Sequence, residues 1–225
     1  MILGMISAVF FLLLCSKIIT KRGANRKIDK GMEKVHKIAG VIFFFLICAH
    51  MILALPLVKQ RPIEMYLSGW LMLVFTAICI ASYFRKEKLK KKWILMHRTL
   101  AVLIFLCLII HVYFGISSTE KYQNKVAEIE IHNINAQNIL DGTYIGEYDV
   151  QYIYAKVKVT VKDEKIKEIT LLEHRNERGK SAESILDAIV KKQQVEVDAV
   201  TQATNSSRVI MKAVDNALEK GKGIR

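Results

Sequence analysis

Four long apolar runs fill the first half of the chain, over residues 1–19, 38–58, 66–84 and 93–116. Each run is close to the roughly 20 residues that an α-helix needs to cross a bilayer. The first has no basic residue before its apolar core and no small-x-small cleavage site, so it is interpreted as a retained helix rather than a signal peptide. The pattern predicts an all-α bundle of four transmembrane helices over residues 1–117.

The period of the pattern changes in the second half. Val157, Val159 and Val161 alternate with polar residues, which is typical of a half-buried strand, and a returning strand is expected over residues 166–174. Two amphipathic helices follow, and their apolar faces hold Ile185, Leu186, Ile189 and Val190 in one and Val209, Ile210, Ala213, Val214 and Ala217 in the other. We therefore expect a small α+β domain over residues 139–225, joined to the bundle by a polar connector, residues 118–138.

The positive charge of the chain lies almost wholly in the first half. Residues 1–117 hold 17 Lys+Arg against 4 Asp+Glu, whereas the remaining residues hold 17 of each. The excess is interleaved with apolar runs instead of covering one continuous surface, so we expect no nucleic acid as a partner.

Loop charges predict an orientation in the bilayer. The segments 17–37 and 85–93, together with Arg98, hold 15 Lys+Arg, while residues 58–69 hold only two. By the positive-inside rule the basic segments face the cytoplasm. This interpretation makes the chain a multi-pass cell-membrane protein whose N-terminus and second half are extracytoplasmic, with lipid headgroups as the ordinary partners of the basic loops.

Histidines stand at both ends of two apolar stretches of equal length. His36 and His50 are 14 residues apart, as are His97 and His111. On an α-helix this spacing is about 1400° of rotation and about 21 Å of rise, so both rings of a helix face nearly the same way at two depths. A single histidine in a membrane more often links helices by a hydrogen bond than binds a ligand. Four in register predict two b-type haems, with iron bound by His36 with His97 and by His50 with His111.

This arrangement resembles the four-helix core of ferric-reductase-like transmembrane cytochromes, in which paired helices each carry two histidines at a similar spacing. The resemblance covers residues 1–117 and rests on the four histidines. Larger members of that family have further helices and a cytoplasmic flavin and pyridine-nucleotide module. Neither is found in these 225 residues, so the electron donor is left open.

A cluster of hydroxyl residues precedes the last predicted helix. Asn205, Ser206 or Ser207 can cap that helix, which puts Thr204 just ahead of its N-terminus. Free backbone N–H groups and the positive end of the helix dipole favour a phosphate there. From the residues alone, the cluster indicates either an anion site or a simple helix cap.

Residues 135–220 resemble the FMN-binding domain shared by flavinylated subunits of the sodium-pumping quinone reductase and the Rnf complex. The motif of that family is approximately Asp-x-x-Ser/Thr-Gly-Ala-Ser/Thr, and the matching residues are Asp198, Thr201, Ala203 and Thr204. The resemblance implies that a dedicated flavin transferase, with FAD as donor, esterifies the Thr204 hydroxyl to the phosphate of FMN. Gln202 stands where the family usually has glycine. Non-covalent flavin, or a domain that has lost its flavin, are the alternatives.

Two further histidines have weaker claims to a role. His174 follows Glu173, and the two match a recurrent Glu-His pair of the same family. We nevertheless expect His174 to be a surface or strand-end residue, and we assign no role to His132.

Together these features predict a two-part membrane protein, an all-α four-helix transmembrane bundle followed by an extracytoplasmic α+β FMN-binding domain. The expected function is electron transfer from a cytoplasmic-side redox protein or quinol, by two haem b groups, to covalent FMN and an external acceptor. One alternative is a membrane-anchored flavin-carrying subunit without haem that assembles with partner redox proteins. Another is a reductase with its own substrate pocket in the outer domain. No catalytic residue is predicted, and the direction of electron flow is left open.

Overall fold

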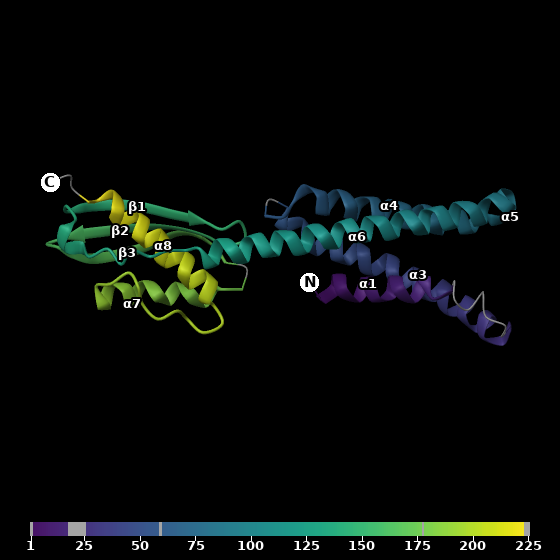
Figure 1. Cartoon of the computed structure of the whole chain (residues 1–225), viewed down its shortest axis with the longest axis horizontal. Coiled ribbons are helices and arrows are strands. Elements are labelled where there is room, and N and C mark those ends of the chain that lie inside the picture. The colour runs from purple at the N-terminus through teal and green to yellow at the C-terminus, as the bar shows by residue number, and fades with distance from the viewer. Residues whose placement is uncertain (1, 18–25, 59, 177, 223–225) are drawn as a thin grey trace. The chain divides into compact units, whose positions relative to one another are not determined.

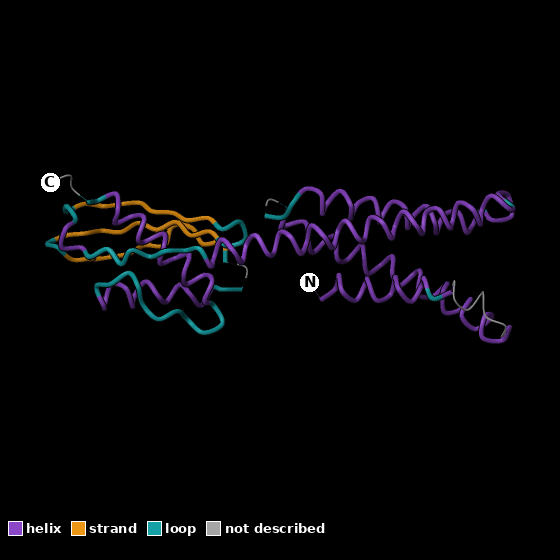
Figure 2. Tube along the Cα trace, in the orientation of Figure 1, coloured by secondary structure: helices purple, strands orange, loops and turns teal. Residues whose placement is uncertain are grey.

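The computed structural model describes residues 2–17, 26–58, 60–176 and 178–222 and divides the chain into two compact units, Met1–Ser118 and Thr119–Arg225. Figure 1 labels the helices and strands in chain order, and in Figure 2 all of the described strands belong to the second unit. The division between the units falls within helix α6, which runs from Lys91 to Ala127. Each unit is described separately below.

The first unit is helical. Its elements are α1 (Ile2–Cys15), α3 (Arg26–Ala54), the 3-10 turn η1 (Leu55–Leu57), α4 (Ile63–Phe84), the short α5 (Lys86–Leu89) and α6. Among the described residues, three helices are long and apolar enough to cross a membrane, namely Lys27–Leu57, Ile63–Phe84 and Lys91–Ala127. Helix α1 is apolar but has 14 residues, about 21 Å of helix against a hydrocarbon core of about 30 Å. Part of the predicted first span, residues 18–19, lies outside the described residues.

One small apolar cluster joins the four longer helices of this unit. It consists of Phe11 from α1, Phe43 from α3, Met72 from α4, and Ile104 and Cys107 from α6. Elsewhere large apolar side chains point outward, and between 11% and 22% of each candidate span's most apolar window is buried. Phe84, for example, is 80% exposed. Such a surface is unfavourable in water but suited to lipid, so the exposure pattern agrees with membrane helices.

The second unit is a small domain of one sheet and helices, the α+β class that the sequence predicts for the second half of the chain. Its antiparallel sheet has the order β1-β2-β3, with β1 at Gly142–Asp149, β2 at Tyr154–Lys162 and β3 at Lys165–Arg175. The helical elements are η2 (Ala136–Asn138), η3 (Lys180–Ser184), α7 (Ile185–Lys192) and α8 (Thr204–Lys220). Strand β1 is a finding beyond the sequence prediction, which had placed only β2 and β3.

The alternation predicted for β2 is confirmed. Val157, Val159 and Val161 are at most 1% exposed, and they face the same side of the sheet. At the β2–β3 turn, Asp163 and Glu164 have φ values of 52° and 59°. Two consecutive positive φ values are those of a type I′ turn, whose twist matches that of the paired strands.

Helix α8 covers the inner face of the sheet, against β1 and β2 (Figure 1). The five apolar residues predicted for its buried face, Val209, Ile210, Ala213, Val214 and Ala217, are all 0% exposed. The close approach is possible because β1 carries Gly146, where a Cβ would overlap with the Ala213 carbonyl and the Ala217 amide. Side chains in residues 118–138, expected to be a polar connector, also enter this core, namely Tyr122, Val126, Ile129, Ile134 and Ala136.

Candidate functional sites

The four histidines of the first unit form two pairs. The rings of His36 and His97 have centroids 6.0 Å apart and planes inclined at 70°. Those of His50 and His111 are 6.2 Å apart and inclined at 75°. Each pair joins one ring from α3 to one from α6, and the pairs are separated by 14 residues along each helix.

Hydrogen bonds determine which ring nitrogen is free in two of the four histidines. Nδ1 of His36 lies 3.1 Å from the carbonyl oxygen of Leu14, and Nδ1 of His111 lies 2.9 Å from that of Met65. A carbonyl oxygen can only accept, so Nδ1 carries the hydrogen and Nε2 presents its lone pair. Histidines that bind metals usually have this support from the second nitrogen.

Glycines bring neighbouring helices close to the outer pair. A Cβ at Gly4 of α1 would lie 3.1 Å from Cε1 of His50, and one at Gly69 of α4 would lie 3.7 Å from the ring of His111. Helix α1 therefore contacts both histidines of α3, at Leu14 and at Gly4. Sequence reasoning missed these supporting residues, although glycines within apolar runs are the signal that could have found them.

The ring spacing fits one metal atom between the members of each pair. Two metal–nitrogen bonds of about 2 Å, with about 1.1 Å from each nitrogen to its ring centre, place the centroids about 6 Å apart. Among the described residues, no group of three or more His, Cys, Asp or Glu side chains is arranged to hold a bare metal ion. A haem iron takes only two axial ligands from the protein, so a pair of histidines suffices for it.

In the second unit, a pocket of about 300 Å³ opens at the N-terminus of α8. Its lining comes from several segments, namely Tyr122, Ile153, Asn176, Arg178, Gly179 and residues 202–206. Thr204 is the first residue of α8 and is exposed, and Ala203 before it makes no side-chain capping bond. The amide groups of the first helical turn thus point toward the pocket end without a side-chain cap, which favours an anion there.

The predicted caps of α8 are corrected by the structure. Asn205 donates from Nδ2 to the hydroxyl of Tyr122 at 2.8 Å, and Ser206 is buried. The hydroxyl of Ser207 accepts from the amide of Val200 at 3.1 Å and donates to the carbonyl of Ala203 at 3.0 Å. These residues lie inside the helix. They hold the preceding loop in place and do not cap α8.

The four motif residues differ in their surroundings. Thr201 and Thr204 are exposed, whereas Ala203 is 4% exposed and packs into the core. Asp198 accepts from Lys192 at 3.1 Å, and its side chain is 97% exposed. Gln202, at the position where the resembling family usually has glycine, has a φ of 65°. This left-handed conformation is one that glycine adopts without cost, so the backbone explains the preference at this position.

His174 is a strand-end residue, one of the two expected alternatives, but its side chain is not at the surface. It lies one residue before the end of β3, and its side chain is 3% exposed. His174 pairs in the sheet with Ala155, which lies on the buried face. Its Nδ1 contacts the Glu183 carboxylate of η3 at 3.0 Å. This contact brings together the two ends of the loop that carries Arg178.

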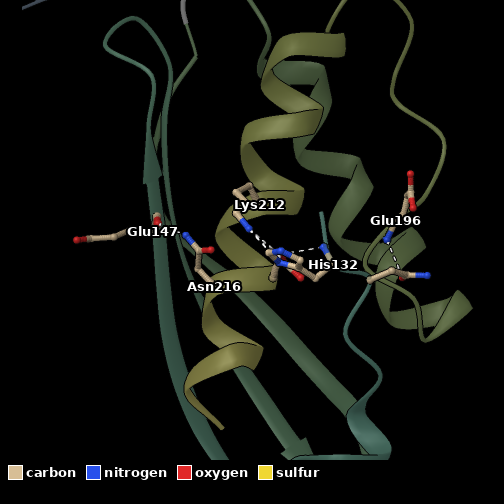
Figure 3. A network of polar contacts seen from close by, with 7 residues as sticks. His132, Glu147, Glu196, Lys212 and Asn216 are labelled. Carbon is tan, nitrogen blue, oxygen red and sulfur yellow. Dashed lines mark hydrogen bonds and ion pairs between the residues drawn. The ribbon is translucent and has the colours of Figure 1, made fainter. Parts of the chain in front are cut away.

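His132 takes part in a polar network on α8 (Figure 3). Its Nδ1 lies 3.1 Å from Oδ2 of Asp215, which is 0% exposed and also accepts from Lys212 at 2.8 Å. The backbone amide of His132 contacts the same oxygen at 3.2 Å. The network attaches residues before β1 to α8 and contains none of the residues that line the pocket.

The second unit thus combines an antiparallel sheet, a covering helix and a pocket at the N-terminus of that helix. Residues 154–219 match the family model of the FMN-binding domain. This match supports an FMN-binding domain in the second unit, with FMN as the ligand and flavin-linked electron transfer as its chemistry. No curated protein and no solved structure matches the chain.

Proposed function

We propose that this protein transfers electrons across a membrane, from a cytoplasmic-side donor or quinol, by two b-type haems, to an FMN covalently bound on the outer side. The observation that carries the proposal is the ring spacing of the two histidine pairs, 6.0 and 6.2 Å, in a chain that also has an FMN-binding domain. When bound, haem supplies one-electron chemistry and FMN joins it to two-electron chemistry.

The haem part of the proposal assigns roles to eight groups of the first unit. His36 and His97 hold the inner iron, and His50 and His111 hold the outer one. The carbonyls of Leu14 and Met65 orient His36 and His111. Gly4 admits the ring of His50 beside α1, and Gly69 admits the ring of His111 beside α4. The loop charges support a bundle of four transmembrane helices whose basic loops face the cytoplasm.

The flavin part assigns the attachment to Thr204. Its hydroxyl attacks the FMN phosphorus of FAD, the new oxygen–phosphorus bond replaces the bond to AMP, and AMP leaves as the hydroxyl proton is lost to a base. A separate flavin transferase supplies that base and the metal. Thr204 is exposed at the first turn of α8, where the amide groups stabilise the resulting phosphodiester anion.

One experiment tests both parts. The full chain is expressed with a flavin transferase and with haem supply, and covalent flavin is read from fluorescence on denaturing gels. We expect the fluorescence to vanish in Thr204→Ala with haem retained, and haem per chain to fall in His50→Ala with flavin retained. Fluorescence that persists in Thr204→Ala rejects the attachment site, and unchanged haem in His50→Ala rejects the pairing.

A second candidate function is a membrane-anchored flavin subunit that has no haem and assembles with partner redox proteins. It is favoured by the FMN-binding match, which covers residues 154–219 and none of the histidine pairs. It predicts covalent flavin with no b-type spectrum in the purified chain. The same expression experiment separates the two functions.

A further inference from the structure

We propose that Arg178 contacts the ring of the bound flavin and stabilises its reduced anion, so that this residue sets the flavin's midpoint potential. The inference rests on the proposed function, because it takes FMN to be attached at Thr204. It adds a binding residue that lies outside the flavinylation motif.

Arg178 is the one charged residue in the pocket lining, all of which lies within the described part of the chain. No hydrogen bond or ion pair links its guanidinium to another described residue. Nearby arginines differ in this respect. Arg175 donates to Asp149 at 2.9 Å, and Arg208 donates to the carbonyl of Ile129 at 2.8 Å. Within the described residues, no acidic side chain lines the pocket, so none there competes with a ligand for Arg178.

The loop that carries Arg178 is held against the start of α8 by two contacts. The His174–Glu183 contact at 3.0 Å joins the strand before the loop to η3 after it. Gly179 packs so closely on Ser206 that a Cβ would overlap with the serine hydroxyl. Arg178, next to Gly179, is thereby kept in the same pocket as Thr204.

Arg178 and Thr204 approach the pocket from different segments. The phosphate of an FMN esterified to Thr204 lies at the first turn of α8, where backbone amides neutralise it. The rest of the molecule is left to occupy the remaining lining, which includes Ile153, Asn176 and Arg178. One isoleucine side chain, an amide and one cation suit an aromatic ring whose edge carries nitrogens and carbonyl oxygens.

Reduction gives the ring a charge that a cation can recognise. A neutral flavin ring that takes up two electrons and one proton becomes an anion with one negative charge. Positive charge near the ring nitrogens favours this product over the oxidised form and raises the midpoint potential. A tenfold loss of preference for the reduced form corresponds to about 30 mV in a two-electron couple.

The test compares midpoint potentials of the flavin-loaded full chain, with dithionite as reductant. The variants are Arg178→Gln, Arg178→Lys and, as a matched loss of charge two residues away at the start of η3, Lys180→Gln, which is exposed and outside the pocket lining. The Thr204→Ala chain supplies the spectrum to be subtracted, because it keeps the remaining chromophores without the flavin.

We expect Arg178→Gln to lower the potential by the equivalent of tenfold or more, Arg178→Lys to restore most of it, and Lys180→Gln to leave it unchanged. Equal potentials in the wild type and Arg178→Gln overturn the inference while leaving the attachment at Thr204 intact. An equal shift in Lys180→Gln also overturns it, since the effect would then be one of general surface charge. A wild-type chain that acquires no flavin rejects the proposed function instead.

Discussion

Nδ1 of His111 lies 2.9 Å from the carbonyl oxygen of Met65 and 3.2 Å from the hydroxyl of Ser68. Both acceptors belong to α4, so one helix orients a side chain that α6 carries. The ring is held with its Nε2 lone pair free, which is the state in which imidazole binds iron. The first prediction tests this relationship directly.

Under the proposed function, replacement of His111 by alanine is expected to reduce haem from two per chain to one, since the outer iron would lose an axial ligand. Ser68→Ala serves as the control, because the Met65 carbonyl still accepts from Nδ1. Haem per chain is measured from the reduced pyridine complex together with the protein concentration. Two haems in His111→Ala would contradict the assignment.

A side chain at Gly4 is expected to displace His50 and lower the occupancy of the outer haem. A Cβ at this position would lie 3.1 Å from Cε1 of His50, and the further methyl groups of valine would come closer. Gly31→Val is the matched control, because no atom lies within 4 Å of a Cβ there. Equal haem content in the two variants would exclude a role for the close contact.

Glycine in place of Gln202 is expected to stabilise the second unit and to speed flavinylation. A φ of 65° costs a residue with a Cβ about 1–2 kcal/mol, and glycine avoids this steric cost. Part of the gain is offset because glycine loses more conformational entropy on folding. Gln137→Gly, at a position outside the residues of positive φ, is expected to destabilise instead. Thermal unfolding and the time course of covalent flavin incorporation measure the two effects, and a lower melting temperature for Gln202→Gly would refute the argument.

Gly179→Ala is expected to destabilise the second unit by about 1–3 kcal/mol and to reduce flavin incorporation, because the new methyl group overlaps with Ser206. The double variant Gly179→Ala with Ser206→Gly removes the opposing side chain, so we expect partial recovery of both properties. Denaturant unfolding of the full chain, followed by flavin fluorescence, provides the measurement. No recovery in the double variant would show that another contact is responsible.

The Tyr154–Glu147 pair is expected to make stability depend on pH at both ends of the range. The tyrosine hydroxyl donates to the carboxylate at 2.8 Å, which lowers the pKa of Glu147 and raises the pKa of Tyr154 to about 12. The pKa of Glu147 is lower in the folded protein than in the unfolded chain. The ionised carboxylate therefore adds to the free energy of unfolding above the ordinary glutamate pKa, and this stabilisation is lost as pH falls through the folded pKa. The neutral hydroxyl of Tyr154 adds to the free energy of unfolding below the ordinary tyrosine pKa, and this stabilisation is lost as pH rises toward the folded pKa of about 12.

The measurement for this pair is the tyrosinate absorbance of the wild type minus that of Tyr154→Phe, repeated in a Glu147→Gln background. We expect the difference signal to titrate near pH 12 with Glu147 present and at lower pH without it. Identical titrations in both backgrounds would show that the hydrogen bond does not form in solution.

Periodic features of the sequence were the most predictable. Two periodic sets are buried as predicted, namely the alternating Val157, Val159 and Val161 and the apolar face of α8. A period of two puts side chains on one face of a strand and a period of 3.6 puts them on one face of a helix, so each set can be buried together in only a few ways. The spacing of the histidines indicated which rings share a depth, and the structure brings His36 beside His97 and His50 beside His111.

Tertiary contacts explain what the sequence could not predict. Strand β1 mixes two glycines with polar residues and becomes a strand by pairing with β2. Tyr122 and Val126 stand in a polar stretch, yet they are buried by a core formed from residues far along the chain. The start of α8 at Thr204 escaped prediction because Ala203, a poor capping residue, precedes it.

The glycine at position 146 has a consequence for how this protein can vary. Because α8 rests on the backbone of β1 at that point, the height of the helix above the sheet is determined by main-chain atoms and not by the size of a side chain. Replacement of an apolar residue elsewhere in the interface is then expected to leave that height unchanged. Thr204 at the first turn of α8 is expected to keep its position when the surrounding core is altered.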